Sequence, residues 1–238
     1  MQMRPIIFTR GNALVVGSFG SLQDLTACTA ERAEEACDVL EIRLDILRRD
    51  GWQTEQKPWA HLRHQPLLFT ARCQEEGGVL ALDARDRESM LAAILDDAAA
   101  VDIEISSVDS MAQSIEQLKQ RNIPWVASCH RFDKVPDLDW WREQRQIAEE
   151  NGATAAKFAA MVHSAEDVDV LEKFQREVAS LCVATMGMGA LAPTSRVRCA
   201  LAGSVLNYGY IGSAPTAPGQ WPAATLRAAI ASGEIPPL

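Results

Sequence analysis

The sequence predicts a single (β/α)8 barrel, the TIM-barrel class of α/β fold, across residues 1–238. Eight short apolar runs of strand length recur along the chain, and their first residues lie 24 to 34 residues apart. Segments with the period of an amphipathic helix separate these runs. A barrel of this class uses about 250 residues for its eight strand–helix repeats. An open, doubly wound parallel sheet is the second interpretation of the same alternation.

The strands follow from the apolar runs in chain order, and the helices from the segments between them. The strands are predicted to begin at Ala13, Val39, Leu67, Val101, Trp125, Ala155, Leu181 and Tyr208. Helices are predicted over residues 21–36, 87–100, 110–121, 137–151 and 164–179. The first begins at a serine suited to N-capping. Residues 48–65 form a longer and more polar connection, so no definite helix is predicted there.

The composition excludes several classes of partner. The net charge is -9 and the pI is ≈ 5.0, with no cluster of lysine and arginine, so neither nucleic acid nor an anionic membrane surface is an expected partner. No apolar run reaches the roughly 18 residues of a membrane span, and residues 1–5 lead into a strand-like segment without a signal-peptide pattern. The six cysteines include no C-x-x-C pair, which is typical of reduced thiols and predicts a cytoplasmic location.

Charged and polar residues recur at the carboxyl ends of the predicted strands. Reactive groups of a (β/α)8 barrel lie at these ends and in the loops that follow. Glu41 and Arg43 are two residues apart on one strand, so they share a face. The other residues at such positions are Arg72, Glu76, Glu104, His130, Lys157 and Arg196. We expect them to gather at one mouth of the barrel, either as an active site or as a structural network of ion pairs.

Lys157 stands in the middle of the apolar run at residues 153–161. A lysine in a low-dielectric pocket loses its proton more readily, and a neutral amine attacks carbonyl groups. The alternative is that its stem covers apolar surface while its ammonium group reaches water. The charged residues at the neighbouring strand ends favour the buried and reactive lysine.

Other pairs of reactive residues are weaker candidates. Cys129 and His130 are adjacent on a strand and face opposite sides, so Cys129 is expected to pack outside the barrel. His61 and His64 have an H-x-x-H spacing without an acidic or thiol partner nearby, which favours a solvated helix over a metal site. Glu104 and His130 offer two metal ligands, but the arginines and the lysine expected beside them oppose a bound cation. No metal site is predicted.

Seven short motifs follow one another between Val39 and Arg227. Residues 39–45 contain an E-x-R-x-D strand, and residues 69–78 read F-T-x-R-x-x-x-E-G-G. The others lie at residues 102–104, 128–130, 156–159, 195–196 and 217–220. Each motif alone is weak, whereas the ordered set is specific. In this order they resemble the motifs of the type I 3-dehydroquinate dehydratase family.

This resemblance implies a fold, a reaction and an assembly. Members of the family are (β/α)8 barrels, are usually homodimers, and need no metal or organic cofactor. They eliminate water from the small molecule 3-dehydroquinate to give 3-dehydroshikimate through an imine. The reaction serves the shikimate pathway of aromatic amino acid biosynthesis, or quinate catabolism.

The resemblance also implies residue roles at the matching positions. Lys157 is expected to be the Schiff-base nucleophile, His130 the general acid and base, and Glu76 the residue that orients His130. The ring hydroxyls of the substrate are expected to bind Glu41, Arg43 and Arg72. Its carboxylate is expected to bind Arg196, Thr216 and Gln220.

The sequence departs from the family pattern at four places. Arg131 follows the histidine where the family often has an aspartate. Tyr208 replaces a common phenylalanine, and Thr216 replaces the usual serine. The loop before Arg196 is longer than is typical, so Arg196 is open to displacement, and Arg198 is then the expected substitute.

Two other functions are weighed against the dehydratase. Another lysine-imine barrel of the aldolase type keeps Lys157 but needs no hydroxyl-binding Glu41–Arg43 pair. A non-catalytic sensor binds a dehydroquinate-like ligand without turning it over, but the chain carries no DNA-binding segment beside the barrel. The presence of Lys157, His130 and Glu76 together favours catalysis.

Overall fold

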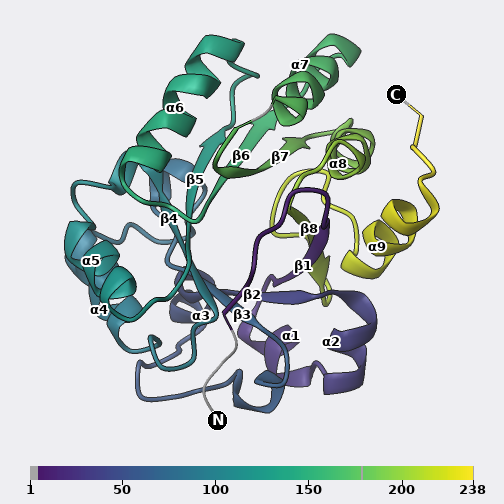
Figure 1. The fold of residues 1–238 in the computed structure, drawn as a ribbon. Helices are drawn as coiled ribbons and strands as arrows, with labels where there is room; N and C mark the ends of the chain where they lie inside the picture. Colours follow the sequence, from purple (N-terminus) through teal and green to yellow (C-terminus); the bar gives the residue numbers. More distant parts are fainter. Residues whose placement is uncertain (1–4, 178, 238) are drawn as a thin grey trace.

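The computed structural model describes residues 5–177 and 179–237, and eight parallel strands form its centre. The strands are β1 (Leu14–Phe19), β2 (Val39–Arg43), β3 (Leu67–Thr70), β4 (Ala100–Glu104), β5 (Trp125–Arg131), β6 (Ala155–Met161), β7 (Cys182–Met188) and β8 (Leu206–Ile211). Figure 1 shows the helices arranged around these strands.

The strand order shows that the sheet curls into a barrel. The hydrogen-bonded order is β7-β6-β5-β4-β3-β2-β1-β8, so β1 lies between β2 and β8. Strands β7 and β8 meet at the seam, where the backbone N–H of Val205 donates to the carbonyl of Val183 at 3.2 Å. The predicted (β/α)8 barrel is confirmed, and the open doubly wound sheet is wrong.

The helices connect successive strands on the outside of the barrel. They are α1 (Leu22–Ala27), α2 (Ala30–Ala36), α3 (Leu44–Arg49), α4 (Ala84–Ala92), α5 (Ala112–Gln120), α6 (Leu138–Glu150), α7 (Ala165–Arg176), α8 (Ala192–Leu201) and α9 (Ala223–Ser232). Short 3-10 helices occur at η1 (Ala60–Leu62), η2 (Gln74–Glu76) and η3 (Ile105–Ser107). None of the helices in the described part of the chain has the length and apolar character of a membrane span.

Every predicted strand is present, and its start is within two residues of the prediction, whereas two helix predictions are wrong. Residues 21–36 form two helices because Cys28 is extended and Thr29 starts a new helix, its side chain accepting from the backbone of Arg32. The helix predicted at 87–100 begins earlier, after the N-cap Asp83, and ends at Ala92. The helix predicted at 164–179 ends at Arg176, and residue 178 lies outside the described residues.

Alternation along the strands decides which side chains enter the barrel. In β6 the ring of Phe158 packs outward, 5.1 Å from Trp141 of α6 and 5.3 Å from Phe174 of α7 between ring centroids. Ala156 and Ala160 belong to the same outer cluster. The residues between them, including Lys157, therefore point into the barrel.

Candidate active site

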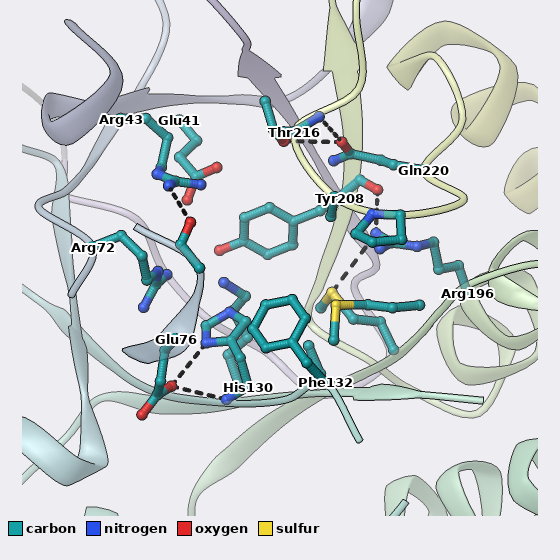
Figure 2. A pocket seen from close by; sticks show the side chains of 17 residues that line it. Glu41, Arg43, Arg72, Glu76, His130, Phe132, Arg196, Tyr208, Thr216 and Gln220 are labelled. Atoms are coloured by element: carbon teal, nitrogen blue, oxygen red, sulfur yellow. Dashed lines mark hydrogen bonds and ion pairs between the residues drawn. The ribbon is translucent and has the colours of Figure 1, made fainter. Parts of the chain in front are cut away.

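A pocket of about 270 Å³ opens at the carboxyl ends of the strands. All nine residues predicted for the site line it: Glu41, Arg43, Arg72, Glu76, His130, Lys157, Arg196, Thr216 and Gln220. Figure 2 shows Glu41, Arg43 and Arg72 on one side and Arg196, Thr216 and Gln220 on the other. The rest of the wall is mostly apolar: Gly77, Phe132, Ala159, Met186, Met188, Tyr208, Ala217 and Pro218.

Lys157 lies deep in this pocket and is only 5% exposed. Its Nζ is 3.3 Å from Oδ2 of Asp102 and 4.4 Å from the centre of the Tyr208 ring. Burial lowers the pKa of the lysine below its ordinary value, and the charge of Arg72 acts in the same direction, while Asp102 opposes them. The alternative of a strand-end lysine reaching water is wrong.

His130 is the penultimate residue of β5 and lies beside Glu76, which is in η2. The Nδ1 atom is 3.0 Å from Oε2 of Glu76, and the backbone N–H of His130 donates to the same oxygen at 2.9 Å. Ser106 donates to Oε1 at 2.7 Å. Because Glu76 engages Nδ1, Nε2 is the ring nitrogen left for a ligand. Burial lowers the pKa of His130 well below 6.5, and the charges of Arg72 and Lys157 act in the same direction.

The turn after η2 places Glu76 against β5. Gly77 has φ 91°, a left-handed conformation that favours glycine. A Cβ atom at this position would lie 2.8 Å from Cζ of Phe132, so a larger residue would also require the Phe132 ring to move. Burial raises the pKa of the Glu76 carboxyl.

Arg72 is held from behind by two buried carboxylates. Its Nη1 donates to Glu104 at 2.8 Å, and its Nη2 is 3.0 Å from Asp102. Arg87 also donates to Glu104, which is fully buried and does not line the pocket. Glu104 therefore positions Arg72 and does not contact a ligand in the pocket. The hydroxyl of Ser128 donates to Asp102 at 2.6 Å and accepts from Arg72.

Glu41 and Arg43 are also fixed by neighbours. The carboxylate of Glu41 accepts hydrogen bonds from the hydroxyls of Thr70, at 2.9 Å, and Ser18. Arg43 donates to both carboxylate oxygens of Asp45, at 2.8 and 2.7 Å. A bidentate pair of this kind fixes the plane of the guanidinium group. These bonds therefore fix the orientation in which Glu41 and Arg43 face a ligand in the pocket.

Arg196 enters the pocket from α8 and is 2% exposed. Its Nη1 donates to the carbonyl of Tyr208 at 2.6 Å and lies 3.7 Å from the sulfur of Met186. In the described chain no carboxylate lies within ion-pair distance of it, and its buried Nε has no hydrogen-bond partner there. Burial lowers its pKa to about 10. Such a guanidinium group is suited to an incoming anion.

Arg196 lines the pocket as predicted, so the longer loop does not displace it, and the alternative residue Arg198 is wrong. Arg198 lies on the outer side of α8, 2.7 Å from Asp169, and also pairs with Glu172. Side chains two residues apart on a helix point about 200° apart, so Arg198 cannot share the pocket with Arg196.

Thr216 and Gln220 complete the side of the pocket near Arg196. The side-chain oxygen of Gln220 accepts from the backbone N–H of Thr216 at 2.8 Å and from its hydroxyl at 2.9 Å. These bonds orient the Gln220 amide so that its NH2 group is left for a ligand. Arg196 and Gln220 therefore offer donors at one end of the pocket.

The weaker candidates lie elsewhere. Cys129 packs in the outer cluster, as predicted from its position next to His130. His61 contacts the carbonyl of Cys28 at 3.0 Å, and His64 pairs with Glu34 at 3.3 Å, both away from the pocket.

Asp102 and Asp45 hold the lysine and an arginine of the site, and sequence reasoning gave neither of them a role. Each had a usable signal. Asp102 is two residues before Glu104, on the same face of β4. Asp45 is the last residue of the E-x-R-x-D motif.

The fold and the pocket define a (β/α)8 barrel with a buried lysine, a carboxylate-held imidazole and an anion-binding end. The family described as Type I 3-dehydroquinase matches residues 16–235, and the chain belongs to this family. It is 35% identical to the 3-dehydroquinate dehydratase of Methanosarcina mazei over 208 residues, which cover 80% of this chain and 83% of that relative. The corresponding protein of Geobacillus kaustophilus is 34% identical over 206 residues, which cover 80% of this chain and 79% of that relative.

The structural comparison agrees with the sequence comparison. The crystal structure of the 3-dehydroquinate dehydratase from Geobacillus kaustophilus aligns with a TM-score of 0.81 at 27% identity. The alignment covers 98% of each chain. The two proteins therefore share the same barrel over nearly their full lengths.

Proposed function

We propose that this chain is a 3-dehydroquinate dehydratase that eliminates water from 3-dehydroquinate to give 3-dehydroshikimate through an imine on Lys157. The observation that carries the proposal is the position of Lys157, which is buried in the same pocket as the His130–Glu76 pair. Family membership supports the substrate. The reaction is a step of the shikimate pathway, and the residues of the pocket suffice for it without a cofactor.

The first stage is attack by the amine of Lys157 on the ketone carbon. The carbinolamine that forms loses water and becomes an iminium ion. Only the neutral amine attacks, and burial together with Arg72 lowers the pKa so that this form is more populated. Asp102 lies 3.3 Å from Nζ and is placed to stabilise the cationic iminium nitrogen that replaces the ammonium group.

The second stage is proton transfer by His130. The iminium ion acidifies the adjacent C–H bond because it accepts the electron pair that the lost proton leaves behind. Neutral His130 removes this proton through Nε2, and an enamine forms. The resulting imidazolium returns the proton to the hydroxyl that leaves as water. Glu76, 3.0 Å from Nδ1, stabilises the imidazolium form. Hydrolysis of the product iminium then frees Lys157.

The two ends of the pocket bind different substrate groups in this proposal. The carboxylate binds Arg196 and Gln220, with Thr216 fixing the Gln220 amide. The ring hydroxyls bind the other side, which carries Glu41, Arg43 and Arg72. This arrangement leaves the ketone carbon near Lys157.

The rate at which substrate becomes trapped on Lys157 is expected to rise with pH. The amine must be neutral, and its pKa lies below 10.5, so the midpoint of the rise is expected below pH 10.5. Borohydride trapping at low 3-dehydroquinate concentration, followed by mass spectrometry, measures this rate. A midpoint at or above pH 10.5 contradicts the effect of burial on Lys157. In turnover, His130 stays neutral to a pH below 6.5 because its pKa is also lowered.

Replacing Arg196 with glutamine is expected to raise KM by about 10- to 100-fold, the range for loss of a hydrogen bond to a charged group. The structural reason is that the guanidinium of Arg196 is buried and that its Nε has no partner among the described residues. The matched control is Arg198→Gln on the same helix, which removes only partly exposed ion pairs with Asp169 and Glu172 and is expected to leave KM unchanged. Steady-state kinetics decide. An equal KM in both variants contradicts the role of Arg196.

The proposed reaction is tested by adding 3-dehydroquinate and recording the absorbance of the conjugated enone in 3-dehydroshikimate. The expected result is an increase in this absorbance with time. Ligand binding measured by calorimetry without enone formation would identify a sensor instead. An imine adduct on Lys157 with cleavage of a carbon–carbon bond would identify an aldolase-type enzyme.

We further propose that the single barrel is the catalytic unit and that it works as a cytoplasmic homodimer. The location is supported by the six cysteines, all of which are free thiols in the structure. The dimer is expected from the resemblance to the family. Light scattering coupled to gel filtration measures the mass and tests it.

A further inference from the structure

Tyr208 places its aromatic ring beside Lys157, and the ring carries a hydroxyl that the proposed reaction does not use. Tyr208 belongs to β8, lines the pocket and is 4% exposed. Its hydroxyl oxygen is buried and has no hydrogen-bond partner in the described chain. Buried hydroxyls in folded proteins nearly always have a partner. An exception in the wall of a binding pocket points to a partner that arrives with the ligand.

Tyr208 contacts two other residues of the site, one through its backbone and one through its ring. The Tyr208 carbonyl accepts from Arg196 at 2.6 Å, and the ring face lies 4.4 Å from Nζ of Lys157. Figure 2 shows the ring crossing the centre of the pocket, with its hydroxyl directed to the side of Glu41 and Arg72 and away from Arg196. The hydroxyl therefore faces the side proposed to bind the ring hydroxyls of the substrate.

The two carboxylates whose charges act on this hydroxyl are hydrogen-bonded to other residues and not to it. Glu41 accepts hydrogen bonds from Thr70 and Ser18. Asp102 is engaged by Lys157, Arg72 and Ser128. Burial and the charges of these two carboxylates raise the pKa of Tyr208 well above 10, so the phenol keeps its proton and acts as a donor.

A substrate attached to Lys157 lies against this ring. Nζ of Lys157 is only 4.4 Å from the ring centre, and the substrate carbon is bonded directly to Nζ. The substrate atoms next to that carbon therefore come within reach of the phenol. Attachment also replaces the ammonium group that now pairs with Asp102. A substrate attached at Nζ is therefore placed next to the phenol ring.

We propose that Tyr208 is a further substrate-binding residue, whose hydroxyl donates a hydrogen bond to an oxygen of the substrate next to the carbon attached to Lys157. The inference rests on the proposed function of the pocket. A phenylalanine at this position makes the same ring contact with Lys157 but lacks the donor. Tyr208 thus favours ligands that carry an oxygen at this place over ligands that do not.

The test compares wild type, Tyr208→Phe and Tyr210→Phe. Tyr210 is the other tyrosine of the chain, lies on the same strand and is not among the residues that line the pocket, so it is the matched control. In Tyr208→Phe, kcat/KM for 3-dehydroquinate is expected to fall by about 10-fold, the upper range for one neutral hydrogen bond. Borohydride trapping on Lys157 is expected to persist at saturation, with its half-saturating concentration raised by a similar factor.

Thermal unfolding without ligand separates binding from a structural role. The melting temperature of Tyr208→Phe is expected to equal or exceed that of wild type, because the hydroxyl has no hydrogen bond to lose within residues 5–177 and 179–237. A lowered melting temperature or an unchanged kcat/KM in Tyr208→Phe overturns the proposed Tyr208 contact. If the wild type is active, the proposed function is unaffected by that result. A wild type that forms neither enone nor adduct overturns the proposed function, and the Tyr208 contact with it.

Discussion

Lys157→Ala is expected to lower turnover of 3-dehydroquinate by about 10⁵-fold or more, the order of advantage that a held nucleophile has over one in solution. The side chain is the amine of the pocket, and alanine cannot form an imine. Asp102 keeps its bonds to Arg72 and Ser128, so the variant is expected to fold. Loss of enone absorbance, together with loss of the borohydride adduct, measures the effect.

The matched control for this variant is Lys173→Ala. Lys173 lies on α7 with its side chain exposed, outside the pocket, so its replacement is expected to leave both turnover and the adduct unchanged. Calorimetry is expected to show that Lys157→Ala still binds ligand, because the arginines at both ends of the pocket are untouched. Turnover at the wild-type rate in Lys157→Ala, or an adduct mapped to Lys173 in the wild type, contradicts the imine at Lys157.

The strands were predictable because they obey a local rule. A strand such as β6 is buried on both faces, and its sequence, apart from Lys157, is an apolar run that stands out from its flanks. Helix boundaries depend on single capping side chains instead. Thr29 starts α2 inside what reads as one helical segment, and Asp83 starts α4 before the predicted residue. The periodicity of the apolar residues does not identify such capping residues.

The pocket residues were predictable for a geometric reason, since parallel strands bring their carboxyl ends to one mouth. The contacts between them were not, because they depend on neighbouring strands. Asp102 lies opposite Thr70 of β3 and Val126 of β5, and this register brings it to both Arg72 and Lys157. Arg198 was misjudged for a related reason. Residues 186–196 read as a long loop, whereas α8 already begins at residue 192 and fixes which arginine faces inward.

His130→Ala is expected to lower product formation by about 10²- to 10⁴-fold, the usual contribution of a positioned acid–base group. The imidazole is the group held by Glu76 at 3.0 Å with Nε2 left for the substrate. Removing it does not touch Lys157, so the imine is expected to form and to accumulate. Enone absorbance measures product formation, and borohydride trapping with peptide mapping measures the imine in the same sample.

The matched control for this variant is His64→Ala. His64 precedes β3, at the opposite end of the strands from the pocket, and its partner is the exposed Glu34. Product formation is expected to stay at the wild-type rate in that control. The variants at Lys157 and His130 then separate the two stages of the reaction. Lys157→Ala loses the adduct and the product together, whereas His130→Ala keeps the adduct and loses the product. If His130→Ala also lost the adduct at saturating substrate, His130 would be needed for imine formation itself, and its assignment to proton transfer alone would be wrong.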